Sequence, residues 1–150
     1  MNTLHGVLPA LVTPLDADGS LNEAALAVLL SRLYHRGCHW AYVVGNTGEG
    51  LLLSVELREQ LAAEVRRLTP PDRSVVVHIG TLNTADSVRL ARHAAGIGAT
   101  AISSLPPARP GGLPSKPSET LLRRGGGQWK VAMERGSRKR WKRYLTPKMV

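Results

Sequence analysis

The chain has 150 residues, enough for one domain with a buried core. Its single cysteine, Cys38, excludes an internal disulfide and is typical of a reducing compartment. No stretch approaches the roughly 18 consecutive apolar residues of a membrane span. Residues 1–11 lack the basic start and the long apolar run of a secretory signal, so we expect a cytoplasmic protein that makes no membrane contact.

The net charge of +9 is distributed unevenly along the chain. Residues 1–107 contain eight Arg, no Lys and nine acidic residues, whereas residues 108–150 contain seven Arg, five Lys and two Glu. The first segment therefore has a net charge of −1 and the second of +10. Because all five histidines precede position 107 and all five lysines follow it, the composition predicts a boundary there.

Up to residue 107, short apolar runs alternate with segments that have one apolar face. The expected order is strand 6–12, helix 22–36, strand 41–44, helix 54–68, strand 74–79, helix 84–98 and strand 101–105. Ser54 and Thr84 are expected to cap helices, and Gly37 stands where a helix should end. This order predicts repeated βαβ units and a parallel α/β sheet, either a barrel segment or a doubly wound sheet. In a barrel, right-handed crossovers would place all three helices on one side.

Residues 108–150 have a different composition, which is rich in Pro and Gly up to residue 127 and in Arg and Lys after residue 137. No helical or strand period persists in them for more than a turn or two. A segment with such charge and so few apolar residues is expected to be disordered. We therefore divide the chain into residues 1–107, an α/β domain, and residues 108–150, an irregular basic tail.

The most informative motif is Gly45-Asn-Thr-Gly-Glu-Gly50, directly after the second expected strand. Loops at the carboxyl ends of parallel strands build active sites in α/β proteins. A glycine-rich loop there exposes backbone N–H groups, and Asn46 and Thr47 add side-chain donors, so the loop could hold a small carboxylate. From the residues alone, however, a tight βα turn is the favoured interpretation.

Several further motifs, in order, carry a resemblance to a known family. They are Gly6-Val-Leu-Pro-Ala-Leu-Val-Thr-Pro14, Gly45-Asn-Thr-Gly-Glu49, Leu53-Ser-Val-Glu-Leu-Arg58, His78-Ile-Gly80, Ala91-Arg-His-Ala-Ala-Gly-Ile-Gly-Ala99 and Ile102-Ser-Ser-Leu-Pro-Pro107. In order and spacing they resemble the dihydrodipicolinate synthase/N-acetylneuraminate lyase family. His78-Ile-Gly80 and residues 102–107 lean toward the sialic-acid-lyase side. The resemblance covers about the first 107 residues and stops after Pro107, where Ala108 and Arg109 replace the family's aromatic pair.

The resemblance implies a TIM (β/α)8 barrel that makes or cleaves a carbon–carbon bond through a Schiff base with pyruvate or another 2-keto acid. Such a barrel needs about 250 residues, so the chain would supply its first four strands and three helices, followed by the tail. Asn46 and Thr47 take the positions that bind the keto-acid carboxylate. The family usually has Ser or Thr where this chain has Asn46, and an amide cannot join a hydroxyl proton relay.

No catalytic residue is assigned, because the resemblance places the catalytic tyrosine after strand five and the Schiff-base lysine on strand six, both beyond the four strands of this chain. A Schiff-base lysine must lose its proton near neutral pH, which requires burial or a cationic neighbour in a formed site. The chain's lysines lie in polar, Pro/Gly-rich or cation-rich sequence, where we expect no buried environment, and Tyr144 beside Arg143 is a poor substitute for the tyrosine. These lysines are Lys116, Lys130, Lys139, Lys142 and Lys148.

The leading hypothesis is therefore a truncated, frame-shifted member of this family, inactive alone. Its expected partner is a small 2-keto acid such as pyruvate, with no cofactor, and the resemblance leaves room for a homo-oligomer. The alternative is a nucleic-acid-binding protein that acts through the tail. The run from Arg138 to Arg143 mixes cations with Trp141, which suits phosphate contacts and base stacking.

Three lesser signals have simpler explanations. His35, Cys38 and His39 are close in sequence, but Gly37 should end the helix between them and no further ligand pair follows, so no metal site is expected. Asp16 and Asp18 resemble the start of a calcium loop but lack its later ligands, so a turn is expected. His78 could face the mouth of a barrel, although a packed or surface histidine is at least as well supported by the sequence.

Overall fold

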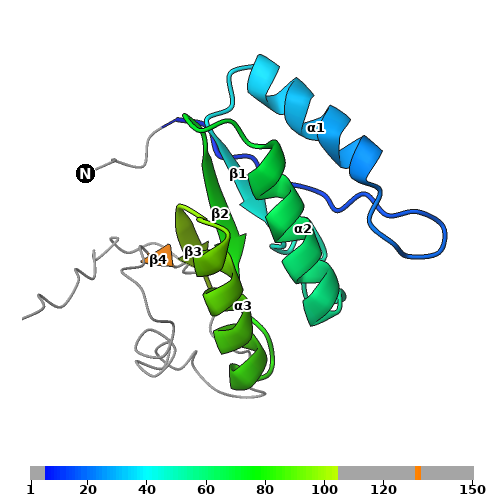
Figure 1. Cartoon of the computed structure of the whole chain (residues 1–150), viewed down its shortest axis with the longest axis vertical. Coiled ribbons are helices and arrows are strands. Elements are labelled where there is room, and N and C mark those ends of the chain that lie inside the picture. The colour runs from blue at the N-terminus through cyan, green and yellow to red at the C-terminus, as the bar shows by residue number, and fades with distance from the viewer. Residues whose placement is uncertain (1–5, 105–130, 133–150) are drawn as a thin grey trace, which may run out of the picture.

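The structure is a computed structural model that describes residues 6–104 and 131–132. Three helices and three strands alternate along residues 23–103, and a two-residue strand follows (Figure 1). In chain order they are α1 (Glu23–His35), β1 (Trp40–Val43), α2 (Val55–Leu68), β2 (Ser74–His78), α3 (Thr84–Gly96), β3 (Ala101–Ser103) and β4 (Val131–Ala132). All three expected helices are present. The strand expected at 41–44 lies one residue earlier, and those expected at 74–79 and 101–105 are present but shorter.

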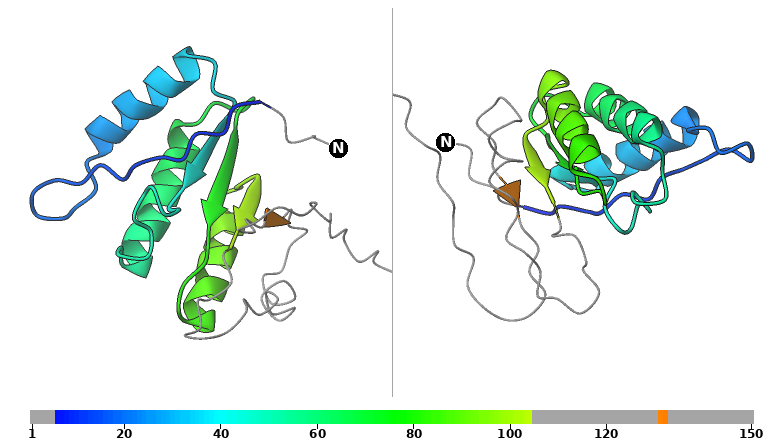
Figure 2. Two further views of the ribbon diagram at one scale, coloured as in Figure 1. Left: turned by 180° about the vertical axis from the view of Figure 1, so that it is seen from behind. Right: turned by 90° about the horizontal axis from the view of Figure 1, so that it is seen from below.

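The strands form one parallel sheet in the order β1-β2-β3-β4. In the register, Tyr42 pairs with Val76, and His78 pairs with Ser103. The three helices lie together on one face of the sheet (Figure 2). A doubly wound sheet carries helices on both faces. Of the two arrangements that the sequence allowed, the structure therefore has the barrel-like one.

The first expected strand, residues 6–12, is an extended segment that forms one isolated parallel bridge, Ala10 with Tyr42. Leu11 donates to the Tyr42 carbonyl at 2.9 Å, and Tyr42 donates to the Pro9 carbonyl at 3.0 Å. The expected strand is wrong in extent, and Pro9 supplies a physical reason. Proline has no N–H, so the donor that a second bridge around Leu8 would need is missing.

The helix ends follow the local chemistry of the sequence. The Ser54 side chain accepts a hydrogen bond from the Leu57 amide at 3.1 Å and caps α2, as expected. Gly37 follows α1 with φ +85°, and the amides of Gly37 and Cys38 return to the carbonyls of Tyr34 and Leu33. The expected cap of the third helix, Thr84, is wrong by one residue.

Asn83, not Thr84, caps α3, and its side chain accepts from the Ala85 amide at 2.8 Å. Both residue types are good N-caps, so local sequence does not separate them. Thr81 explains the difference, because its hydroxyl accepts from the Asn83 amide at 3.1 Å and holds that residue in an extended conformation before the helix. Thr84 is then the first residue of the helix.

The two faces of the sheet have different cores. The helix-covered face buries Val43, Val75, Val77 and Ile102 against the helices. The opposite face, which corresponds to the inside of a barrel and is called the inner face below, buries Trp40, Val76 and Ala101, with Tyr42 packed against them. At the carboxyl ends of the strands this inner face becomes polar, and the candidate site lies there.

Within residues 6–104 and 131–132, no helix is long and apolar enough to cross a membrane. Apart from β4, which the sequence did not predict, the tail lies outside the described residues. The boundary at residue 107 and the expectation of a disordered or frame-shifted segment over 108–150 remain predictions.

Candidate functional site

The candidate site centres on residues 45–50, called the cradle loop below, which leave the carboxyl end of β1. The chain reverses at Val44, whose φ of +54° lies in the left-handed region that β-branched residues rarely adopt. Glu49 also has positive φ, +53°. The loop closes on itself, because the Gly50 amide donates to the Gly45 carbonyl at 3.0 Å and the Glu49 amide to the Asn46 carbonyl at 3.0 Å.

The three glycines of the cradle loop are required by close packing. A Cβ on Gly50 would lie 1.9 Å from the Val44 carbonyl oxygen, and one on Gly48 would lie 2.9 Å from the Leu11 carbonyl oxygen. A Cβ on Gly45 would lie 2.3 Å from the Tyr42 ring. The glycines therefore permit a tight turn, as the simpler interpretation of the motif held, and this turn determines which backbone groups are presented.

Asn46 and Thr47 lie side by side in the cradle loop, and both are exposed. Their amide N–H groups, and that of Gly48, have no acceptor among the described residues, and the two side chains have no partner there either. Asn46 lines a shallow hollow of about 240 Å³ with Glu49, Gly50 and two leucines. Gly48 itself is buried, but unpaired N–H groups on consecutive residues are the geometry that binds small anions.

A second anchor of the cradle loop comes from the first extended segment. The Thr13 hydroxyl donates to the Gly48 carbonyl at 2.7 Å. This bond turns the Gly48 carbonyl away from the exposed side of the loop and toward residues 11–13. Thr13 lies within the first family motif of the sequence, but the sequence predicted no role for it.

Three polar side chains meet on the inner face next to the cradle loop, and we call Tyr42, His78 and Ser103 the inner cluster. The Ser103 hydroxyl donates to the Tyr42 hydroxyl at 2.7 Å, and the Tyr42 and His78 rings lie 6.4 Å apart between centroids. Ser103 and His78 are paired across β2 and β3. Of these three residues the sequence pointed to His78 alone, because the Tyr42–Ser103 contact joins residues 61 positions apart and depends on the register of the sheet.

His78 is a buried histidine, 3% exposed, with neither ring nitrogen hydrogen-bonded within the described structure. Burial lowers its pKa to about 4, and the positive charge of Arg58 acts in the same direction. The Val44 carbonyl lies close enough to oppose that shift, although it makes no well-aligned hydrogen bond to the ring. His78 is therefore neutral at physiological pH and presents one donor and one acceptor.

Arg58 connects two family motifs, residues 53–58 and residues 78–80, by hydrogen bonds. It lies on α2, is 2% exposed, and donates through Nη2 to the His78 carbonyl at 2.8 Å and through Nη1 to the Gly80 carbonyl at 3.1 Å. Burial lowers the pKa of its guanidinium, and nearby Asp86 partly offsets that shift. The side chain thus ties the first turns of α2 to the end of β2, beside the cradle loop.

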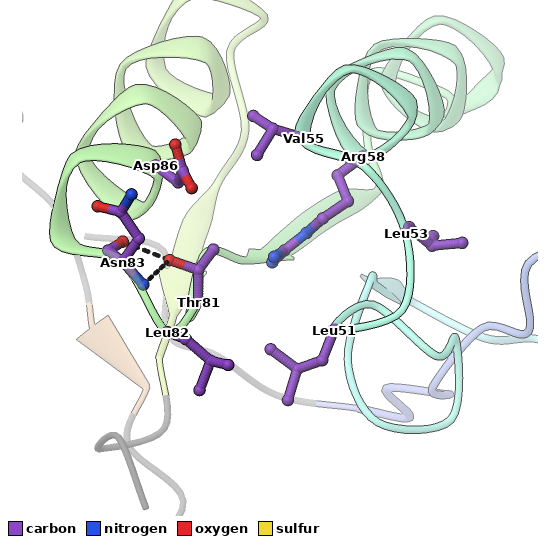
Figure 3. A pocket seen from close by; sticks show the side chains of 8 residues that line it. All are labelled: Leu51, Leu53, Val55, Arg58, Thr81, Leu82, Asn83 and Asp86. Carbon is purple, nitrogen blue, oxygen red and sulfur yellow. Dashed lines mark hydrogen bonds between the residues drawn. The ribbon is translucent and has the colours of Figure 1, made fainter.

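Arg58 also lines a hollow of about 190 Å³ between the starts of α2 and α3 (Figure 3). Figure 3 shows its guanidinium directed between the loops that carry Leu51 and Thr81, with Asp86 on the opposite wall. This hollow shares Leu51 with the one lined by Asn46, so the two are neighbours at the same edge of the sheet.

The other sequence candidates do not assemble into a site. Among the described residues, no group of three or more His, Cys, Asp or Glu side chains is placed to hold a metal ion. Asp18 lies in the turn expected of it, where its carboxylate accepts from the Ser20 amide and hydroxyl at 2.9 and 2.7 Å. The tail lysines and Tyr144 lie outside the described residues.

Comparison of the sequence with known proteins shows which family the chain belongs to. The sequence pattern of the dihydrodipicolinate synthetase family matches residues 3–108. The chain belongs to that family. An N-acetylneuraminate lyase of Rhizobium meliloti (strain 1021) is 35% identical over 104 residues, covering 69% of this chain and 35% of that enzyme.

Solved structures agree with the family assignment. Proteus mirabilis N-acetylneuraminate lyase superposes with a TM-score of 0.76 at 29% identity, covering 88% of this chain and 46% of that chain. A Ruminococcus gnavus sialic acid aldolase mutated at its catalytic lysine superposes with a TM-score of 0.74 at 27% identity, covering 85% of this chain and 43% of that one. The chain thus spans about a third of the length of the lyase from Rhizobium meliloti and less than half of these solved chains.

Proposed function

We propose that the cradle loop binds the carboxylate of pyruvate or another 2-keto acid, as part of a carbon–carbon lyase site of the sialic-acid-lyase type. One observation carries the proposal: three consecutive unpaired N–H groups, on Asn46, Thr47 and Gly48, at the carboxyl end of a strand in a chain of this family. In barrels of this kind, loops at that end of the strands form the active site.

The chemistry of the loop suits a small anion. A carboxylate oxygen accepts two or more hydrogen bonds, and bonds to an ionised acceptor are about twice as strong as those between neutral groups. The Thr47 hydroxyl and the Asn46 amide add donors beside the backbone groups. Buried Arg58 contributes a positive charge behind the loop that no carboxylate neutralises through a direct ion pair among the described residues.

The bond-making step needs a lysine amine that loses its proton near neutral pH. The Ruminococcus gnavus aldolase has a catalytic lysine, whereas residues 1–107 of this chain contain none. The five lysines after residue 107 stand in polar or cation-rich sequence, where we expect none of the burial in a formed site that a Schiff-base lysine needs. We therefore propose that the 150-residue polypeptide binds a 2-keto acid without forming a Schiff base to it.

Reductive trapping tests whether the polypeptide forms a Schiff base. The polypeptide is incubated with labelled pyruvate and borohydride, and its intact mass and bound label are measured. A full-length N-acetylneuraminate lyase serves as the positive control. We expect no stable adduct; a stoichiometric adduct on any lysine would contradict the proposal, and peptide mapping would identify the residue.

Equilibrium titration with pyruvate tests whether the cradle loop binds a 2-keto acid. Thr47→Val removes the hydroxyl with little change in volume, and Thr84→Val is a control at the exposed first residue of α3. We expect Thr47→Val to weaken pyruvate binding by roughly tenfold to a hundredfold, the loss of one hydrogen bond to a charged group, and the control to bind as the wild type. Equal affinities in all three chains would contradict the assignment.

Nucleic-acid binding through the tail is the alternative function that the sequence suggested. It rests on residues 108–150, whose Arg and Lys side chains lie outside the described residues, and the comparisons give it no support.

A further inference from the structure

Tyr42 contacts the first residue of the cradle loop. A Cβ built on Gly45 would meet three ring atoms of Tyr42 as its nearest neighbours, Cε1 at 2.3 Å, Cδ1 at 3.0 Å and Cζ at 3.4 Å. The glycine backbone therefore packs directly against the ring. The ring limits how far the start of the loop can move toward the inner face of the sheet.

The Tyr42 ring is itself held across the sheet. Tyr42 lies on β1, and its hydroxyl accepts a hydrogen bond of 2.7 Å from Ser103 on β3, two strands away. The His78 ring on the intervening strand lies beside it, at 6.4 Å between centroids. A phenol fixed at its backbone and at its hydroxyl has little rotamer freedom left, so it is a firm surface for Gly45.

Between Tyr42 and Gly45, the backbone is strained. Val44 has φ +54° although it is β-branched and fully buried. Such conformations persist where the surrounding structure imposes them. Here the chain is fixed just before Val44 by the Tyr42 backbone bonds to residues 9 and 11, and just after it by the contact of Gly45 with the ring.

We propose that Tyr42 is a positioning residue for 2-keto-acid binding: its ring, held by Ser103, fixes Gly45 and thereby aims the Asn46, Thr47 and Gly48 amides. The assignment rests on the proposed function of the cradle loop. Tyr42 acts through Gly45 and touches no ligand. The ring provides the positioning surface, and the hydroxyl bond to Ser103 restricts the ring.

The test compares three substitutions in the full chain by titrating pyruvate and following backbone amide signals by NMR. Tyr42→Leu removes the ring, and Tyr42→Phe keeps the ring but loses the bond to Ser103. Trp40→Leu is the matched control, because Trp40 is buried on the same face of the same strand, two residues further from the loop. Thermal unfolding is recorded for each variant.

Tyr42→Leu should weaken pyruvate binding by about tenfold, since small misplacements of binding groups have large effects. Tyr42→Phe should weaken binding by a smaller factor, about twofold, because the ring remains but its bond to Ser103 is lost. Trp40→Leu should lower the unfolding temperature but leave the dissociation constant unchanged, which a merely structural role for Tyr42 would not predict. A Tyr42→Leu chain that binds pyruvate as the wild type does would overturn the assignment.

Two further outcomes keep the proposals separable. If the wild type binds no pyruvate, the proposed function fails. The amide chemical shifts of residues 46–48 then test the positioning role, and shifts that are unchanged in Tyr42→Leu would overturn that role. If Tyr42→Leu does not fold, Gly45→Ala replaces it, because the added methyl meets the ring and displaces the loop. Wild-type affinity in Gly45→Ala would then overturn the assignment.

Discussion

The guanidinium of Arg58 lies 2.8 Å from the carbonyl oxygen of His78, and this hydrogen bond joins the start of α2 to the end of β2. A second bond from the same group reaches the Gly80 carbonyl at 3.1 Å. Both carbonyls lie where β2 leaves the sheet, in residues that are buried. The charge of Arg58 also helps to keep His78 neutral, so one side chain fixes both the backbone and the protonation state of this corner.

Replacing Arg58 should be costly, because two buried carbonyls would lose their donor. We expect Arg58→Met to lower the free energy of unfolding by about 3 kcal/mol, the scale of buried hydrogen bonds to a charged group. Arg92→Met is the control, since Arg92 is exposed on α3 and should change stability by less than about 0.5 kcal/mol. Urea unfolding followed by circular dichroism measures both, and equal losses would refute this account of Arg58.

Two glycine substitutions should shift stability in opposite directions. Gly50→Ala places a methyl 1.9 Å from the Val44 carbonyl oxygen, which forces the cradle loop apart. We expect it to destabilise the chain by about 1–3 kcal/mol, the usual cost of overpacking. Gly96→Ala meets no atom within 4 Å at the end of α3 and should stabilise it by up to about 0.5–1 kcal/mol. Thermal unfolding compares them, and a Gly50→Ala chain at least as stable as the wild type would show that the loop is not tightly packed.

His78 should make stability depend on pH between about 4 and 6.5. Its pKa is lowered in the folded state, so below pH 6.5 the unfolded chain binds a proton that the folded chain does not. The stability due to a neutral His78 is therefore present in full above pH 6.5 and is lost as the pH falls toward 4. Between pH 7 and pH 5 we expect the wild type to lose about 2 kcal/mol.

The measurement is urea unfolding at both pH values, chosen so that most carboxylates stay ionised throughout. His78→Leu should lose most of this dependence, while His35→Gln, at the exposed end of α1, should retain it. A His78→Leu chain with the same pH dependence as the wild type would show that another group titrates on unfolding.

Local sequence predicted those features that depend on neighbouring residues. The apolar periods located all three helices, and Ser54 and Gly37 marked helix ends correctly because capping and positive φ act within a few residues. The choice between Asn83 and Thr84 depended on the hydroxyl of Thr81. The limited pairing of residues 6–12 follows from Pro9, whose missing donor was visible in the sequence but whose partner strand was not.

The candidate site was predicted in part. The motif at residues 45–50 was correctly identified as a tight βα turn at the end of a strand, and whether Asn46 and Thr47 bind a carboxylate remains a prediction. Tyr42 and Ser103 were missed, because a contact between residues 61 positions apart appears only once strands are placed in register. Arg58 was quoted within a motif, but a buried arginine on a helix resembles an exposed one until the carbonyls it binds are known.

The central claim is that the cradle loop recognises a carboxylate, and an amide-resolved NMR titration with pyruvate tests it most directly. Pyruvamide, which has the keto group but no negative charge, is the matched ligand. We predict saturable shifts concentrated on the amides of Asn46, Thr47 and Gly48 with pyruvate, and shifts several-fold smaller with pyruvamide. Equal responses to the two compounds, or pyruvate shifts located elsewhere in residues 6–104, would contradict the claim.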